Sequence, residues 1–163
     1  MKRKGQFQIG FGMIFSIIII IFIVGIVFYT ISHFLGVQKC ADLGLFHNDL
    51  EKSIDNVWRS SVARDSFSSS LPSGVEMVCF GSLDDSPRAD SREQHEYFNR
   101  NRIFQSNMFI YPIQSECGDG LSMNNYNNIK AENDRFFCVE VVDRKVSFIL
   151  EKRSGENKVI VSR

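Results

Sequence analysis

An uncharged stretch of 34 residues, 5–38, constrains the fold of this 163-residue chain more than any other feature. It holds no Asp, Glu, Lys or Arg, and its central residues 11–31 are almost wholly apolar. An α-helix rises about 1.5 Å per residue, so a helix over residues 11–31 matches the roughly 30 Å hydrocarbon core of a bilayer. The sequence therefore predicts a transmembrane helix, which we place over residues 11–37, with the lipid bilayer as its partner.

The predicted helix has the character of a retained anchor and not of a cleaved secretory signal. The isoleucines at 17–21 are weak helix formers in water, but lipid offers a backbone amide no other partner and so enforces the helix. The apolar run continues to Val37, and no Ala-x-Ala-like cleavage site lies near its end. We expect a single-pass anchor.

The charges that flank the span predict its orientation. Lys2, Arg3 and Lys4 precede it, whereas the first basic residue after it is Lys39. Basic residues next to a span stay on the cytoplasmic side. We therefore expect a cytoplasmic N-terminus over residues 1–10 and a domain outside the cell membrane over residues 39–163.

The composition of that domain excludes several classes of protein. It carries 16 basic and 19 acidic residues, a balance that excludes a basic nucleic-acid binder, and we expect no nucleic-acid partner. With 44% hydrophobic residues overall, the chain is not a disordered one, and the span excludes a fully soluble cytosolic enzyme.

Four cysteines, Cys40, Cys79, Cys117 and Cys138, all fall in the predicted outer domain. An even number in an oxidising compartment predicts two disulfides. Zinc is the alternative, but the chain has no Cys-x-x-Cys pair. Four cysteines allow three pairings, and among these we favour Cys40 with Cys79, which fastens the juxtamembrane segment, and Cys117 with Cys138, which closes a polar loop onto a strand.

Apolar residues recur at steps of three and four after Cys40, which predicts an amphipathic helix over about residues 41–64, continuous with the membrane helix. Its single tryptophan, Trp58, is expected to anchor the core between helix and sheet. The serine-rich stretch 66–74, with Pro72, is expected to break the helix and form a loop.

The rest of the chain is predicted to form strands, at 75–80 and 108–111 and in a C-terminal antiparallel meander. The meander comprises residues 136–142, 145–152 and 157–162. Its residues Val146, Phe148 and Leu150 are expected to face the helix. The charged stretch 81–102 between the first two strands is expected to be an exposed loop. The predicted fold is α+β, with one amphipathic helix packed on a small antiparallel sheet.

The chain offers no recognisable catalytic constellation. Neither Gly-x-Ser-x-Gly nor His-Glu-x-x-His occurs among its three histidines. Acidic residues around His95 match no EF-hand, so a solvated loop is favoured over a divalent-cation site. We expect no catalytic residue, cofactor or metal. We expect a domain that binds or scaffolds other membrane or cell-surface proteins. An enzyme, with its site in the 81–102 or 113–134 loops, is the least favoured hypothesis.

The basic N-terminus carries a resemblance. Lys2-Arg3-Lys4-Gly5-Gln6, followed directly by an apolar helix, resembles the processing site of archaeal type IV pilin-like proteins. The resemblance implies cleavage between Gly5 and Gln6 and a filament or filament-assembly subunit, which is the alternative function. The remainder, with Leu71-Pro72-Ser73 and Val78-Cys79-Phe80, resembles small single-span archaeal membrane proteins of unassigned function.

Overall fold

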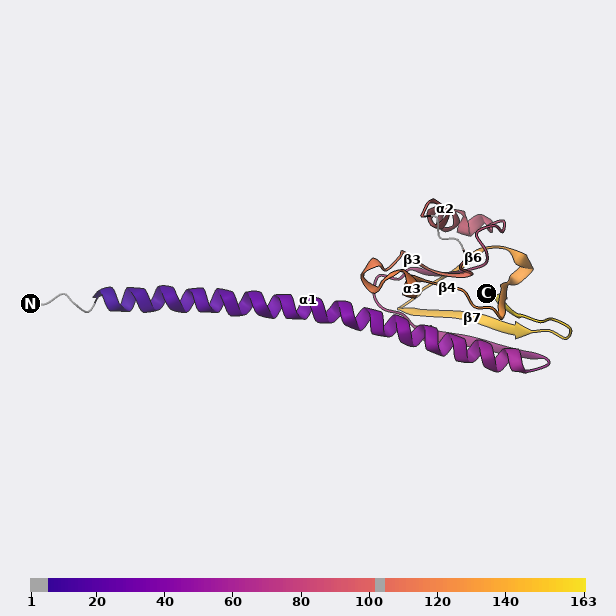
Figure 1. Cartoon of the computed structure of the whole chain (residues 1–163), viewed down its shortest axis with the longest axis horizontal. Helices are drawn as coiled ribbons and strands as arrows, with labels where there is room; N and C mark the ends of the chain where they lie inside the picture. The colour runs from indigo at the N-terminus through magenta and orange to yellow at the C-terminus, as the bar shows by residue number, and fades with distance from the viewer. Residues whose placement is uncertain (1–5, 102–104) are drawn as a thin grey trace, which may run out of the picture. The chain divides into compact units, whose positions relative to one another are not determined.

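The computed structural model describes residues 6–101 and 105–163 (Figure 1). It confirms an α+β fold with a long N-terminal apolar helix and two small sheets. The chain divides into two compact units, Met1–Gln38 and Lys39–Arg163, and helix α1 (Gln6–Arg59) contributes to both.

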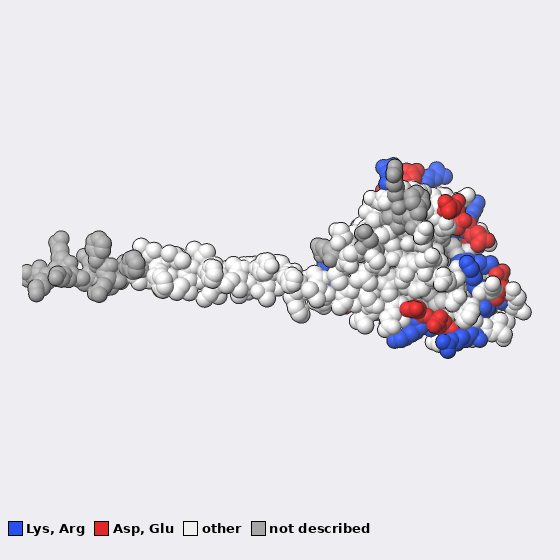
Figure 2. Space-filling view, in the orientation of Figure 1, with Lys and Arg blue, Asp and Glu red and all other residues white. Residues whose placement is uncertain are grey.

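The first unit is a helix whose described side chains are nearly all exposed. From Gly12 to Leu35 every side chain is exposed, and Figure 2 shows this part of the helix without a charged residue. The hydroxyls of Ser16, Thr30 and Ser32 each donate to the carbonyl four residues earlier, at 2.8–2.9 Å, so these polar groups need no other partner. By length and composition α1 is the one helix in the described chain that could cross a membrane.

In the second unit the same helix becomes amphipathic. One face is buried, formed by Leu43, Phe46, Leu50, Ile54 and Val57. The helix ends at Arg59 and not near residue 64 as predicted, because the chain turns and enters a strand at Ala63. Trp58 is not the predicted core anchor: its side chain is 41% exposed, and its Nε1–H donates to the Asn157 carbonyl at 3.0 Å.

The first sheet, sheet A, has the strand order β1-β7-β8-β5. Strands β1 (Ala63–Ser70), β7 (Lys145–Lys152) and β8 (Val159–Ser162) are antiparallel neighbours, and β5 (Ile129–Ala131) runs parallel to β8. The loop predicted for 66–74 is therefore wrong over its first half, which lies in β1. Phe67 explains the difference, because its burial among exposed serines makes this run one-sided.

The second sheet, sheet B, has the order β4-β3-β2-β6 and is antiparallel throughout. Its strands are β4 (Met123–Asn124), β3 (Met108–Tyr111), β2 (Met77–Phe80) and β6 (Phe137–Glu140). Strand β3 has the predicted bounds.

The single meander predicted for the C-terminus is wrong. Strand β6 pairs along its length with β2 in sheet B, whereas β7 and β8 form a hairpin in sheet A. A tight turn at Asp143 and Arg144, both with positive φ, connects β6 to β7. The two residues that flank the turn, Val142 and Lys145, form an isolated antiparallel bridge. One local turn therefore carries the chain between two sheets.

The main core lies among the buried face of α1 and the two sheets. Val146, Phe148 and Leu150 of β7 belong to it, as predicted, and Phe148 packs on Phe67 and Phe80 with ring centroids 5.0 and 4.8 Å away. The opposite face of sheet B packs under helix α2 (Arg92–Arg100), which lies at the top of Figure 1.

Helix α2 corrects the prediction of an exposed loop over 81–102. Its Phe98 is fully buried against Phe109 and Phe136. The nine residues of α2 are polar or charged apart from Tyr97 and Phe98, and two apolar residues are too few to predict a helix that packs on a sheet. The remaining short elements are α3 (Asp119–Ser122) and the 3-10 helices η1 (Ala89–Ser91), η2 (Ser115–Cys117) and η3 (Glu132–Asp134).

Candidate functional site

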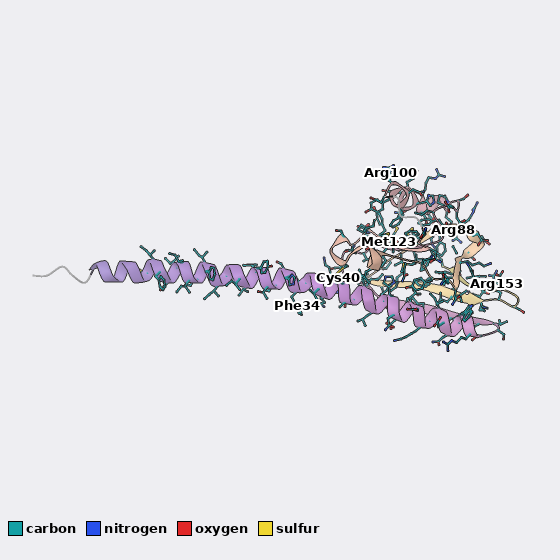
Figure 3. The ribbon with its side chains drawn as sticks, viewed as in Figure 1. Phe34, Cys40, Arg88, Arg100, Met123 and Arg153 are labelled. Atoms are coloured by element: carbon teal, nitrogen blue, oxygen red, sulfur yellow. A yellow bond between two sulfur atoms is a disulfide. The ribbon has the colours of Figure 1, made fainter. Side chains whose placement is uncertain are left out.

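All four cysteines are in disulfides, which join Cys40 to Cys117 and Cys79 to Cys138. The prediction of two bridges is confirmed, and the favoured pairing is wrong. Cys79 and Cys138 lie directly opposite each other on β2 and β6, and Cys117 at the end of η2 meets Cys40 on α1, which Figure 3 labels. The first contact depends on which strands pair and the second on where η2 lies against α1, and spacing along the chain reveals neither.

The possible processing site lies at the edge of what the structure describes. Gly5 falls outside the described residues, and Gln6 begins α1 with its side chain outside them. Cleavage between these residues stays a prediction.

A buried histidine joins α1 to the segment after β3. His47 Nε2 lies 2.9 Å from the Leu121 carbonyl, so Nε2 carries the proton and donates it, and Nδ1 accepts from the Tyr126 hydroxyl at 2.8 Å. Burial lowers the pKa of His47, opposed by the Leu121 carbonyl and by the charge of Glu51. Burial also raises the pKa of Tyr126. Both ring nitrogens of His47 are therefore occupied by hydrogen bonds that connect α1 to residues 121 and 126.

The histidine on α2 is also structural. His95 Nε2 lies 3.0 Å from the Leu83 carbonyl, and its Nδ1 lies 3.2 Å from the side-chain nitrogen Nδ2 of Asn99. Neither His47 nor His95 contacts a serine or cysteine nucleophile in the hydrogen bonds described. Among the side chains that the structure describes, no three of His, Cys, Asp or Glu gather closely enough to hold a metal ion. The expected lack of a catalytic, cofactor or metal site stays a prediction.

The backbone edges of the two sheets distinguish one surface from the rest. An unpaired edge strand exposes a row of N–H and C=O groups that can pair with another chain. The four edge strands are β1, with eight residues, and β5, β4 and β6, with three, two and four.

The edge of β6 is largely covered. The Val141 amide donates to the Glu76 carbonyl at 2.8 Å, in register with the β2–β6 ladder, so residues 136, 138 and 140 face away from β2. Phe136 bonds through both its backbone groups to residues 86 and 88. The Cys138 amide donates to Ser91 Oγ at 2.9 Å, and the Cys138 carbonyl accepts from Arg163.

Arg163 is held over this edge by its neighbours. Its guanidinium lies 2.7 Å from Asp90 and 5.9 Å from the centre of the Phe137 ring. Hydrogen bonding from Arg163 lowers the pKa of Asp90. The one remaining outward residue, Glu140, lines a hollow of about 460 Å³ beside Arg163. A single open residue is too short an edge for strand pairing.

The edge of β1 is open along its whole length. The Leu71 amide donates to the Arg144 carbonyl at 2.8 Å, in register with the β1–β7 ladder, so the odd-numbered residues of β1 bond to β7. The even-numbered residues Arg64, Ser66, Ser68 and Ser70 therefore direct their N–H and C=O groups outward. All four are exposed, and no hydrogen bond within the described residues reaches these backbone groups.

A hollow lies beside this open edge, within the second unit. It has a volume of about 330 Å³, with Asp49, Lys52 and Ser53 of α1 on one side and Asp65, Ser66 and Ser68 of β1 on the other. Two carboxylates against one ammonium give it a negative balance. We call this hollow, together with the outward groups of β1, the β1 groove.

Sequence reasoning missed the β1 groove because it treated the serine run as a loop. The one signal present was Phe67, an apolar residue alternating with small polar ones. A single apolar residue is too weak to predict an eight-residue strand, and nothing in the run itself indicates which side is paired.

Comparison with protein-family models, curated proteins and solved structures finds no match to this chain.

Proposed function

We propose that this chain is a single-pass membrane anchor that holds a disulfide-stabilised domain outside the cytoplasm, where the domain binds other membrane or cell-surface proteins. The observation that carries the proposal is the direct succession of two features. The helix that could span a membrane leads straight into a unit whose four cysteines are all bridged. Disulfides persist in oxidising compartments and are rare in the cytosol.

The charges next to the span support the same orientation. Lys2, Arg3 and Lys4 precede it and favour a cytoplasmic N-terminus. The segment that follows then lies outside, in the compartment where its disulfides are stable.

Binding is favoured over catalysis by how the polar groups are used. Both histidines of the second unit hold structural contacts, whereas the β1 groove presents unused backbone donors and acceptors. An open edge is suited to holding a partner chain through main-chain hydrogen bonds.

The orientation is tested with two cysteine variants of the full-length protein in intact cells. Ser154→Cys places a thiol in the exposed β7–β8 turn, and Lys2→Cys places one before the span. A membrane-impermeant maleimide should label the first variant in intact cells and the second only after lysis. The reverse pattern, or four free native thiols in the unreduced protein, would overturn the proposal.

A pilin-like filament or filament-assembly subunit is the second candidate. The sequence Lys4-Gly5-Gln6 favours it, together with a helix that starts at Gln6 and leads into a sheet-rich unit. Against it, Gly10 stands where pilins usually carry a glutamate. The two functions differ by a five-residue leader, so the intact mass of the protein extracted from native membranes separates them: loss of residues 1–5 favours the filament subunit, and their retention favours the permanent anchor.

A further inference from the structure

We propose that the β1 groove binds an extended peptide segment of a partner protein, which adds a strand to sheet A and places a basic side chain between Asp49 and Asp65. The inference rests on the proposed function, because it names the partner chemistry of a domain that acts by binding. It also predicts where on the domain the partner lies.

The backbone of β1 provides the main attraction. Arg64, Ser66, Ser68 and Ser70 offer four N–H donors and four C=O acceptors in one row. At about 6.8 Å for every second residue, the row extends about 20 Å, which matches an extended segment of roughly seven residues. Strand addition of this kind obtains its affinity from main-chain hydrogen bonds and its selectivity from side chains alongside.

The edge has few of the devices that keep edge strands from pairing. Natural edges are protected by short length, proline, charged side chains or a bulge. Strand β1 has eight residues in unbroken register with β7, it contains no proline or bulge, and its charges are confined to Arg64 and Asp65 near its start. Three of its four outward residues are serines, whose short side chains leave the backbone accessible. The covered edge of β6 shows that this fold can close an edge where pairing is not used.

The charges beside the edge indicate the chemistry of the partner. Asp49 on α1 and Asp65 on β1 line the same hollow, with Lys52 as its only basic lining residue. A lysine or arginine of an added strand would find two carboxylates there, whereas an acidic residue would meet net repulsion. Exposed pairs of this kind contribute little each, so charge selects the partner and the backbone holds it.

A second copy of this chain fits the edge less well than a partner peptide. Two β1 strands related by two-fold symmetry pair antiparallel. Each strand would bring Asp65 as well as Arg64, so an added β1 carries no net positive charge for the hollow.

The test uses the full-length protein in phosphatidylcholine nanodiscs, where a basic peptide has no anionic lipid to bind. The probe is the synthetic peptide acetyl-Thr-Val-Thr-Lys-Thr-Val-Thr-amide, and its matched control has Glu in place of Lys. Residue-resolved hydrogen exchange should show that the lysine peptide slows the amides of Arg64, Ser66, Ser68 and Ser70. The amides of Phe67 and Ser69, already bonded to β7, should not change.

Three variants separate backbone pairing from other contacts. Ser68→Pro removes one outward N–H without touching the β7 ladder, and we expect at least a tenfold loss of peptide affinity. Ser68→Ala removes only the hydroxyl and should bind as the unaltered protein does. Asp49→Asn with Asp65→Asn should weaken the lysine peptide about fivefold and leave the glutamate peptide no weaker. A cooperative thermal unfolding transition shows that each variant is folded.

Several outcomes would overturn the proposal. Absence of protection with the lysine peptide rejects strand addition, and equal affinity for both peptides rejects the basic partner. Protection of the outward amides without peptide, increasing with protein concentration, identifies a second copy as the occupant. All of these leave the orientation of the domain intact, so failure of this inference is distinct from failure of the proposed function, which the maleimide experiment decides.

Discussion

The two longest edge strands, β1 and β6, are treated in opposite ways by the same fold. Strand β6 is covered at Phe136 by backbone bonds to residues 86 and 88, and at Cys138 by Ser91 and Arg163. Strand β1, twice as long, has no such cover within the described residues. Length alone does not decide whether an edge is closed, since the shorter edge is the protected one.

The two edges differ in whether other segments of the chain supply hydrogen-bonding groups to cover them. The cover of β6 comes from two segments: residues 86–91, which directly precede α2, and Arg163, which follows β8. Within the described residues nothing comparable packs against the edge of β1, where α1 leaves a hollow. The open edge of β1 is thus available for pairing with another chain.

The largest effect is expected from removing the disulfide that fastens β6 to β2. Cys79 and Cys138 are 0% and 3% exposed, so Cys79→Ala with Cys138→Ala loses buried packing as well as the cross-link. The loop-entropy model alone gives about 4 kcal/mol of unfolding free energy. Urea unfolding of the full-length protein in detergent measures the loss.

The second disulfide is the matched control for that measurement. Cys40→Ala with Cys117→Ala opens a loop of similar length, but both side chains are only half-buried. We expect a smaller loss of unfolding free energy, and earlier reduction of this bridge by dithiothreitol. Equal losses in the two double variants would contradict the view that β6 is fixed more firmly than α1.

A pair of proline substitutions on β1 should show the two sides of the strand. Ser69→Pro removes an amide that bonds to Val146 and should cost about 2–4 kcal/mol of unfolding free energy. Ser68→Pro removes an outward amide and should cost less than about 1 kcal/mol. Thermal unfolding of the two variants measures the difference. Similar losses would mean that the even-numbered residues of β1 are paired after all.

A smaller effect is expected where the cover of β6 is removed. Ser91→Ala leaves the buried amide of Cys138 without its acceptor, which should cost about 1–2 kcal/mol. Ser86→Ala is the control, because Ser86 acts through its backbone carbonyl and its hydroxyl is exposed. Hydrogen exchange at Cys138 should accelerate in the first variant only. Acceleration in both would assign the cover to the whole loop and not to Ser91.

Much of the fold could be predicted because its signals are local. The uncharged run over 5–38, the three- and four-residue steps from Leu43 to Val57, and the alternation in β7 each lie within one element. Burial then follows the pattern, as at Phe148. The number of disulfides could be predicted for a similar reason, since it needs only a count and a compartment.

What failed depended on contacts between distant segments. The assignment of β6 to sheet B and of β7 to sheet A is a property of strand order. The pairing of Cys40 with Cys117 depends on how η2 lies against α1. Helix α2 is stabilised by burying Phe98 against sheet B, which its charged sequence does not reveal. The β1 groove could not be predicted for both reasons, because its strand is weakly patterned and its open side is defined only by β7.

The smallest effect on stability is expected from protonation of His47. This residue lies on α1, the helix beside the β1 groove, and its ring is hydrogen-bonded to the Leu121 carbonyl and the Tyr126 hydroxyl. Burial lowers the pKa of His47 below its ordinary 6.5, so the unfolded chain binds more protons than the folded one once the pH falls below about 7. Stability contributed by neutral His47 is fully present above that range and is lost as the pH falls through the lowered pKa. We therefore expect the melting temperature to decrease between pH 7 and pH 5.

His47→Gln should flatten this pH dependence of the melting temperature, since it removes the titrating group but keeps a donor for Leu121. His95→Gln, which also removes an imidazole, should retain the dependence. A steeper decrease in His47→Gln would show that other groups control the acid response and that α1 is not weakened by protonation of His47.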